Sequence, residues 1–578
     1  MNRFLSLLLC ALSPFIILCQ GLNIYEGDIT PGLKGYCVTE IARGEKESID
    51  LEVIGILEGN LVNQTYLLVR LFGERIEKYG VAAGMSGSPV YLEDKLLGAI
   101  AFTYSFQREN LAGVTLIRET IEQCREIESL DLFLLDNISI ESLDRELLIK
   151  SDFKRDSQFI MPVKGIYQSG RMTSFNEIPL SFKPIDIPSL SSKSRELVFQ
   201  KNADIKPGDT FGVLLMKGDL EISAFGTITL VNEADNTAYA LGHPVFSLGA
   251  RNIPITKAKT VYTVPSNNLS FKVAENISII GTMDAESEAG IKFSLGKEPD
   301  FIPFGINYET DKGSRDFNFD LACFPLAVPS LYQNASFASI QNYIGTFTTR
   351  SVEAEVEFRG TGDTVLRFRN IYDGFSSFSQ YITEISNIIS ILLFNEFMEF
   401  PLESIQARVK IMKEIERYSL INCNISTKSP KQGEKIDINM LLASNRDNKI
   451  ALKSEITIPD YFPDSRAMII VCDYRSYIIF ELMRNPERFS PKSYGELLRL
   501  INEYPSANKI YIMLYSFSPS FSIDGQELNN LPVFYEKMMA LDQSLVNKHN
   551  FSLQDLAVLE MDFAVSGGKF FPVEIFYR

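Results

Sequence analysis

The sequence has 578 residues, more than one hydrophobic core ordinarily organises, and domain sizes predict about three or four units. Apolar residues make up 45% and charged residues 22%, which is typical of a folded globular protein and excludes a disordered chain. The net charge of −17 excludes a nucleic-acid partner, because binding phosphates requires clustered Lys and Arg.

The N-terminus has the pattern of a secretory signal over residues 1–21. Arg3 supplies a short positive region, residues 4–18 are apolar, and Gly21 offers a small residue for cleavage. Lipid anchoring at Cys19 and a retained anchor remain open as alternatives. No later apolar run approaches the roughly 20 residues that span a bilayer. We expect an exported protein, periplasmic, envelope-associated or secreted, that meets a membrane through its N-terminus alone.

Seven cysteines occur in the sequence, and two of them lie in the signal. The others are scattered and show no C-x-x-C spacing, so neither a zinc site nor any other metal or cofactor is expected. One or two disulfides and buried free thiols both remain open for these five: Cys37, Cys124, Cys323, Cys423 and Cys472.

The elements expected along the chain are mostly β-strands, with turns marked by Gly, Asn and Asp. A helix is expected over residues 377–397, and another begins after Ser490, an N-cap residue followed by a proline. Residues 421–460 have the strand rhythm of an immunoglobulin-like module. We divide the chain into a signal (1–21), a first β module (22–125), a connector (126–200), a second β module (201–350), a β/helical connector (351–420) and a C-terminal immunoglobulin-like and α/β region (421–578).

The stretch "GMSGSPVYLEDKLLGAI" in the first module is typical of a nucleophile turn. Acyl transfer by serine needs a hydroxyl on a sharp turn, N–H groups that converge on an oxyanion, and a base. Gly84 and Gly87 permit the turn, and the N–H groups of Gly84 and Ser86 have the two-residue spacing of an oxyanion hole. A glycine turn without chemistry is the alternative.

The base of such a serine is usually histidine, and the sequence has only two. His549 lies in the polar stretch "VNKHNFS" and is expected at the surface. His243 follows a strand in "AFGTITLVNEADNTAYALGHPVF" and is the candidate base, although a hydrogen-bonded structural histidine would also fit this position.

"GMSGSPVYLEDKLLGAIAF" and the segment ending in "ALGHPVF" resemble the sporulation stage IV B (SpoIVB) serine peptidases, which are trypsin-like. The resemblance covers residues 24–320. It implies two β-barrel modules, Ser86 as nucleophile, His243 as base and a specific protein substrate. In that family the histidine precedes the serine, so the modules here stand in exchanged order. The fold expected is therefore mostly β, with exchanged trypsin-like double β-barrel modules and C-terminal β-sandwich-like and small α/β regions.

The family's catalytic acid is missing from its place before the serine, where this chain has "RLFGERIEKYG". Glu74 and Glu77 are candidate acids, although each also fits a solvated surface carboxylate. Asp235 is expected to belong to a hairpin turn. Two functions therefore stay open, namely an exported serine endopeptidase of a bacterial envelope acting on a protein or peptide, and a non-catalytic pseudo-peptidase that serves as a scaffold.

Overall fold

The computed structural model contains 53% strand and 18% helix, which confirms the mostly β prediction. The chain divides into two compact units, residues 1–303 with 318–338, and residues 304–317 with 339–578. The residues described are 23–58, 65–129, 157–158, 163–164, 196–247, 249, 251–344, 350–362, 364–398, 400–412, 417–444, 448–460, 462, 465–485, 489, 491, 493–523, 526–528, 533–539, 547–549 and 551–577. The predicted signal lies outside them, as does most of the predicted connector.

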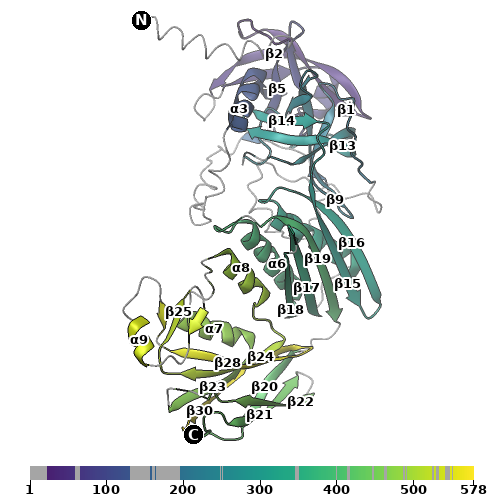
Figure 1. Ribbon diagram of the computed structural model, residues 1–578. Helices are drawn as coiled ribbons and strands as arrows, with labels where there is room; N and C mark the ends of the chain where they lie inside the picture. Colours follow the sequence, from purple (N-terminus) through teal and green to yellow (C-terminus); the bar gives the residue numbers. More distant parts are fainter. Residues whose placement is uncertain are drawn as a thin grey trace, which may run out of the picture. The chain divides into compact units, whose positions relative to one another are not determined.

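The first unit begins with a closed barrel of six strands (Figure 1). Its strands pair in the order β4-β1-β2-β3-β6-β5, and β5 returns to pair with β4. Apolar side chains alternate along the strands into one core, which includes Met85 beneath the serine turn. The strands are β1 (Lys34–Ala42), β2 (Glu45–Glu58), β3 (Thr65–Leu71), β4 (Pro89–Leu92), β5 (Lys95–Tyr104) and β6 (Leu111–Leu116), with β7 (Ser157–Gln158) beside β5.

A second sheet of the same unit also curls, because β10 pairs with both β11 and β9. The pairings run β9-β12-β13-β14-β11-β10 and return to β9, which makes a second ring of six strands. The strands are β9 (Thr210–Gly218), β10 (Ile222–Asn232), β11 (Thr237–Ala240), β12 (Pro254–Val264), β13 (Phe271–Ser287) and β14 (Gly290–Leu295), with β8 (Val163–Lys164) beside β10. The predicted turn at residues 232–236 joins β10 to β11.

Two helices belong to the first barrel's sequence. α2 (Glu74–Tyr79) precedes the serine turn, and α3 (Ile117–Ser129) follows β6. α3 lies against β13 and β14 of the second ring (Figure 1), where Thr120 Oγ1 donates to the Ala289 carbonyl at 2.8 Å. The two rings are thus packed together as parts of one unit.

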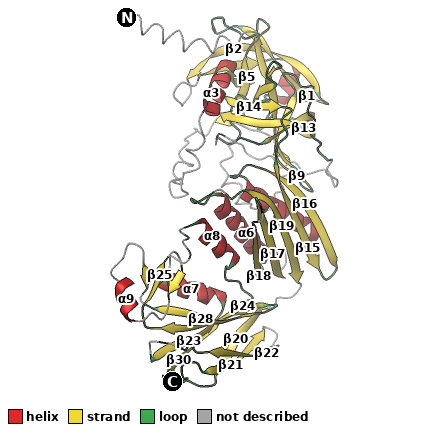
Figure 2. Ribbon diagram, in the orientation of Figure 1, coloured by secondary structure: helices red, strands yellow, loops and turns green. Residues whose placement is uncertain are grey.

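Among the described residues, the second unit contains one sheet built around β17 (Arg350–Gly360) and three smaller sheets. Strands β17, β18 (Val365–Gly374) and β19 (Leu402–Met412) form the sheet with residues 304–310 of β15 (Phe301–Thr310), whose hairpin partner is β16 (Gly313–Ala322). Helix α6 (Ser377–Leu393) confirms the helix expected there, and both it and α8 (Tyr494–Asn502) pack against β18 (Figure 2). Helix α5 (Val328–Ile344) follows β16.

The C-terminal residues form two four-stranded sheets around a shared apolar core. One contains β20 (Arg417–Ile425), β21 (Lys435–Ser444), β22 (Lys449–Thr457) and β29 (Ala564–Ser566); the other contains β23 (Arg466–Cys472), β24 (Lys509–Ser516), β28 (Ser552–Glu560) and β30 (Gly568–Glu574). The remaining elements are α7 (Tyr474–Arg484), α9 (Val533–Met539), β25 (Ser520–Ile523), β26 (Gln526–Leu528) and β27 (Asn547–His549). Helix α8 begins at Tyr494 with Ser493 as its N-cap, later than the expected Ser490 cap.

Candidate functional site

The serine turn has a backbone that only glycine adopts easily. Gly84 has φ +93° and Gly87 has φ +91°, both in the left-handed region. Between them Ser86 lies at the tip, and Pro89 opens β4 directly after the turn. A methyl group on Gly87 would lie 1.8 Å from the Thr227 carbonyl oxygen. The glycine therefore permits both the turn and the close approach of strand β10.

The carbonyl groups of this turn are held by the second ring. Thr227 of β10 donates its N–H to the Ser86 carbonyl at 2.8 Å and its hydroxyl to the Gly84 carbonyl at 2.8 Å. Two residues along the same strand, the Thr229 hydroxyl donates to the Gly87 carbonyl at 2.8 Å. All these groups are buried. The second ring thus sets the orientation of the peptide planes around the serine.

The N–H groups of the turn divide into two kinds. Those of Met85, Gly87 and Ser88 donate to backbone carbonyls at 3.0 Å or less. Among the described residues, the N–H groups of Gly84 and Ser86 have no acceptor. Buried N–H groups without an acceptor are rare in folded proteins and call for an explanation. These two are the donors that the sequence predicts for an oxyanion.

The Ser86 side chain is 7% exposed, and its Oγ donates to the Ala101 carbonyl at 3.4 Å. That length lies beyond the usual range for O–H···O bonds, so the hydroxyl is weakly held and little free energy opposes its rotation. The neighbouring Ser88 differs, because its Oγ donates to the Met85 carbonyl at 2.6 Å and closes the turn. Ser86 is the reactive candidate of the two, and Ser88 is structural.

The backbone before His243 contacts β5, the strand whose Ala101 carbonyl accepts the Ser86 hydroxyl. Leu241 has φ +76°, a strained value for a residue with a side chain, and Gly242 has φ +71°. A methyl group on Gly242 would lie 3.4 Å from the Ala101 Cβ, on the residue whose carbonyl accepts from Ser86. The Gly242 carbonyl is itself held by the Thr115 hydroxyl at 2.6 Å. The serine and histidine segments therefore meet through the middle of β5.

The His243 ring is buried, with 1% of the residue exposed. Its Nδ1 lies 2.7 Å from the Pro244 carbonyl oxygen, which can only accept, so Nδ1 carries the proton and Nε2 the lone pair. Burial lowers the pKa of His243 to about 4, against the opposing effect of this hydrogen bond. A neutral ring with a lone pair on Nε2 has the protonation state that a general base requires at pH 7. The Ser86 hydrogen bond goes to Ala101 and not to this ring, so transfer requires a rotation of the hydroxyl.

Glu286 of β13 is a residue of this site that the sequence reasoning missed. Its buried carboxylate accepts the N–H groups of Val245, Phe246 and Ser247, the first at 2.6 Å and the last at 3.3 Å. Charge-assisted bonds of this kind are about twice as strong as neutral ones. The carboxylate therefore anchors the loop that follows His243. No local signal marks it, since it lies on a distant strand in the sequence.

The two candidate acids lie elsewhere. Glu74 and Glu77 occupy the first turn of α2 and are both exposed. Among the described contacts neither carboxylate bonds to His243. Asp235 holds the β10–β11 turn, as expected, by accepting the Thr237 hydroxyl at 2.6 Å.

Metal centres and disulfides are both absent from the described residues. Within the described ranges, no group of three His, Cys, Asp or Glu side chains could hold a metal ion. The five cysteines outside the predicted signal are free thiols, which answers the disulfide question left open by the sequence. No helix in the described part of the chain is long and apolar enough to cross a bilayer.

The second histidine corrects a prediction. His549 was expected at the surface, but it is 6% exposed and its Nε2 lies 2.8 Å from the Ser522 hydroxyl. The polar residues around it suggest exposure, but His549 lies on β27, which pairs with β25, and the residue is buried. Ser522 and His549 form a second serine–histidine pair in the molecule.

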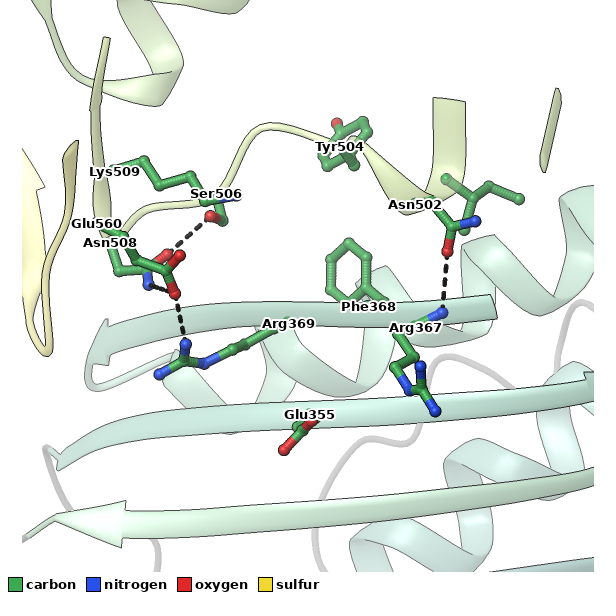
Figure 3. Close-up of a pocket in the computed structure, with 11 residues that line it drawn as sticks. Glu355, Arg367, Phe368, Arg369, Asn502, Tyr504, Ser506, Asn508, Lys509 and Glu560 are labelled. Atoms are coloured by element: carbon green, nitrogen blue, oxygen red, sulfur yellow. Dashed lines mark hydrogen bonds and ion pairs between the residues drawn. The ribbon is translucent and has the colours of Figure 1, made fainter. Parts of the chain in front are cut away.

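The second unit also has a polar pocket of about 110 Å³ between β18 and the residues after α8 (Figure 3). Arg369 on its wall pairs with Glu353 at 2.6 Å and with Glu560, and Arg367 pairs with Glu357 at 3.1 Å. These arginine charges are compensated within the protein, and nothing in the pocket marks a ligand class.

Comparisons with known proteins give no relative: no protein-family model, no curated protein and no solved structure matches this chain. Function must therefore be argued from the geometry of the site.

Proposed function

We propose that this chain is an exported serine endopeptidase of a bacterial envelope that cleaves a specific protein partner, with Ser86 as nucleophile and His243 as base. The observation that carries the proposal is the pair of buried N–H groups on Gly84 and Ser86, which have no acceptor among the described residues. One belongs to Ser86 itself and the other lies two residues before it, on a turn whose carbonyl groups all accept hydrogen bonds. Such donors, fixed in advance, favour a developing oxyanion.

The proposed reaction begins when Ser86 Oγ attacks a peptide carbonyl carbon and His243 Nε2 takes the hydroxyl proton. The carbonyl oxygen becomes an oxyanion and accepts the N–H groups of Gly84 and Ser86. The C–N bond then breaks as His243 returns the proton to the leaving amine. Water, deprotonated by His243, then attacks the acyl-serine ester. The C–O bond to Ser86 breaks, the acid leaves, and His243 returns its proton to Ser86 Oγ, which restores the hydroxyl.

The exchanged trypsin-like order is part of this proposal. Two six-stranded rings in one unit support it, because one carries Ser86 and the other carries His243. Catalytic geometry depends on which groups meet and not on their order along the chain, as unrelated serine hydrolases demonstrate. The N-terminal pattern over residues 1–21 supports export.

A non-catalytic scaffold is the second candidate, and one observation favours it: the Ser86 hydroxyl bonds to Ala101 and not to His243. Under this alternative, binding would fall to the β-rich second unit. Strand β22 lies at the edge of its sheet and could pair with an extended peptide.

The test is labelling of the folded chain by a fluorophosphonate, which phosphonylates the oxygen of an activated serine and releases fluoride. We expect labelling of the natural protein and none of Ser86→Ala. Ser522→Ala is the matched control, since it removes the serine of the other serine–histidine pair. Labelling lost in Ser522→Ala but kept in Ser86→Ala would move the reactive centre to the second unit. A folded natural protein that is not labelled would favour the scaffold.

A further inference from the structure

A lysine without exposed atoms lies under the serine turn. Lys272 of β13 is 0% exposed, and its N–H donates to the Ala83 carbonyl at 2.9 Å, the peptide that carries the Gly84 N–H. Its methylene groups pass beneath Gly84, where a methyl group would lie 3.1 Å from the lysine Cβ and Cδ. The backbone and side chain of one residue thus both contact the turn.

The ammonium group of Lys272 ends between two hydroxyls. Nζ donates to Thr39 Oγ1 at 2.6 Å and lies 3.4 Å from Thr227 Oγ1. The Thr227 hydroxyl has one proton, which it gives to the Gly84 carbonyl. The contact between Nζ and Thr227 therefore runs from the lysine to the threonine. A chain of donors leads from the ammonium through Thr227 to Gly84, and each bond in such a chain polarises the next.

One carboxylate near the ammonium compensates part of its charge. Glu40 of β1 is 5% exposed and accepts the N–H groups of Thr210 at 3.1 Å and Thr260 at 2.9 Å. Burial lowers the pKa of Lys272 to about 8, against the raising effects of Glu40 and Cys37. Burial raises the pKa of the Cys37 thiol to about 12, so this neighbour of Lys272 is neutral at neutral pH.

A buried lysine is a costly way to fill a barrel core. Replacing a whole buried charge pair by apolar side chains of similar volume is often neutral or stabilising, whereas removing one partner alone is destabilising. Packing beneath Gly84 needs only the methylene groups, which methionine would also supply. The ammonium therefore has a use other than packing, and the contacts lead to the turn.

We propose that Lys272 is a positioning residue for the oxyanion-binding turn, acting through its own N–H on the peptide before Gly84 and through Thr227 on the peptide after it, and supplying a positive charge beneath the oxyanion. This inference rests on the proposed function. Under this inference the second ring supplies Lys272 and Thr227 to the anion site, in addition to the base His243.

The experiment compares the second-order rate of fluorophosphonate labelling from pH 5 to pH 10 in the natural protein, Lys272→Met and Thr227→Val. Lys257→Met is the matched control, because Lys257 lies on the neighbouring strand β12 and bonds to the Asp204 carbonyl at the surface. Loss of one oxyanion donor typically slows a reaction by about 10²–10³-fold. Lys272 acts one bond further away, so we expect about tenfold slowing in Lys272→Met and none in Lys257→Met.

The pH profile separates positioning from packing. In the natural protein the labelling rate should fall as pH rises through about 8, where Lys272 loses its charge. Lys272→Met should lack this fall, even though its melting temperature drops because Glu40 has lost its charge partner. The slowing in Lys272→Met and Thr227→Val should not add in the double variant, since they belong to one chain of donors.

Two results would overturn the inference. The first is labelling of Lys272→Met at the natural rate with the alkaline fall retained. The second, decisive if Lys272→Met fails to fold, is a natural rate and profile in Thr227→Val. A natural protein without any labelling overturns the proposed function itself, so the two failures are distinguishable.

Discussion

Replacing Gly87 by alanine should separate the two rings at the serine turn. The new methyl would lie 1.8 Å from the Thr227 carbonyl oxygen and 2.6 Å from the Leu241 nitrogen, both backbone atoms. Neither can move aside as a flexible side chain would, so the turn itself must shift. Gly32→Ala is the matched control, because Gly32 has nearly the same φ, +90°, and nothing within 4 Å of the added methyl.

The loss of unfolding free energy can be estimated from the hydrogen bonds that a shifted turn would lose. A left-handed alanine costs roughly 1–2 kcal/mol, partly offset by the lower entropy of its unfolded chain, so Gly32→Ala should cost about 1 kcal/mol. In Gly87→Ala the turn also loses its bonds from Thr227 and Thr229, each worth roughly 0.5–1.5 kcal/mol. The total is about 4 kcal/mol, which lowers the melting temperature of a unit this size by roughly 10 °C.

The assay is calorimetric unfolding of the full chain, with the transition of the first unit identified by limited proteolysis. Fluorophosphonate labelling of Ser86 should fall in Gly87→Ala and stay unchanged in Gly32→Ala. Equal melting temperatures for the two variants would refute the argument, because they would mean that strand β10 does not press on the turn.

Two further predictions concern the histidine side of the site. Glu286→Gln should lower the free energy of unfolding by about 2 kcal/mol and slow labelling, because a neutral amide binds the Val245 N–H more weakly. Thermal unfolding measures the first effect and the labelling rate the second. An unchanged labelling rate would contradict a role of Glu286 in holding this loop. The free energy of unfolding should fall by about 3 kcal/mol as pH drops from 6.5 to about 4, since His243 is protonated at higher pH in the unfolded chain than in the folded one. Urea unfolding of His243→Gln should lack this dependence. The same slope of unfolding free energy against pH in both proteins would refute the prediction.

Local sequence patterns predicted the turn and the strands but not the contacts between them. Gly84 and Gly87 mark the turn, because few residues other than glycine adopt their positive φ values. Glu286, Lys272 and Glu40 carry no such signal. Their roles depend on the register in which two curled sheets meet, and residues far apart in the chain determine it.

Burial of polar residues was equally invisible in the sequence. His549 has polar neighbours in the sequence, yet it is buried on strand β27, which pairs with β25. The N-cap of α8 was misassigned for a related reason. Ser493 accepts the Glu496 N–H at 3.3 Å and begins the helix, although Ser490 followed by proline is the stronger local pattern. Tertiary packing selects among local alternatives that the sequence leaves nearly equal.

The missing acid has a structural counterpart with a different chemistry. In a serine triad a carboxylate accepts the Nδ1–H bond, fixes the tautomer and stabilises the imidazolium. Here the Pro244 carbonyl accepts that bond at 2.7 Å, so the tautomer is fixed by a neutral group. One carboxylate oxygen of Glu286 accepts the three N–H groups of the loop that follows His243. Burial lowers the pKa of His243 to about 4, which makes the imidazolium unfavourable. Under the proposed function, this arrangement would give slow acyl transfer, which suits cleavage of one partner better than general digestion.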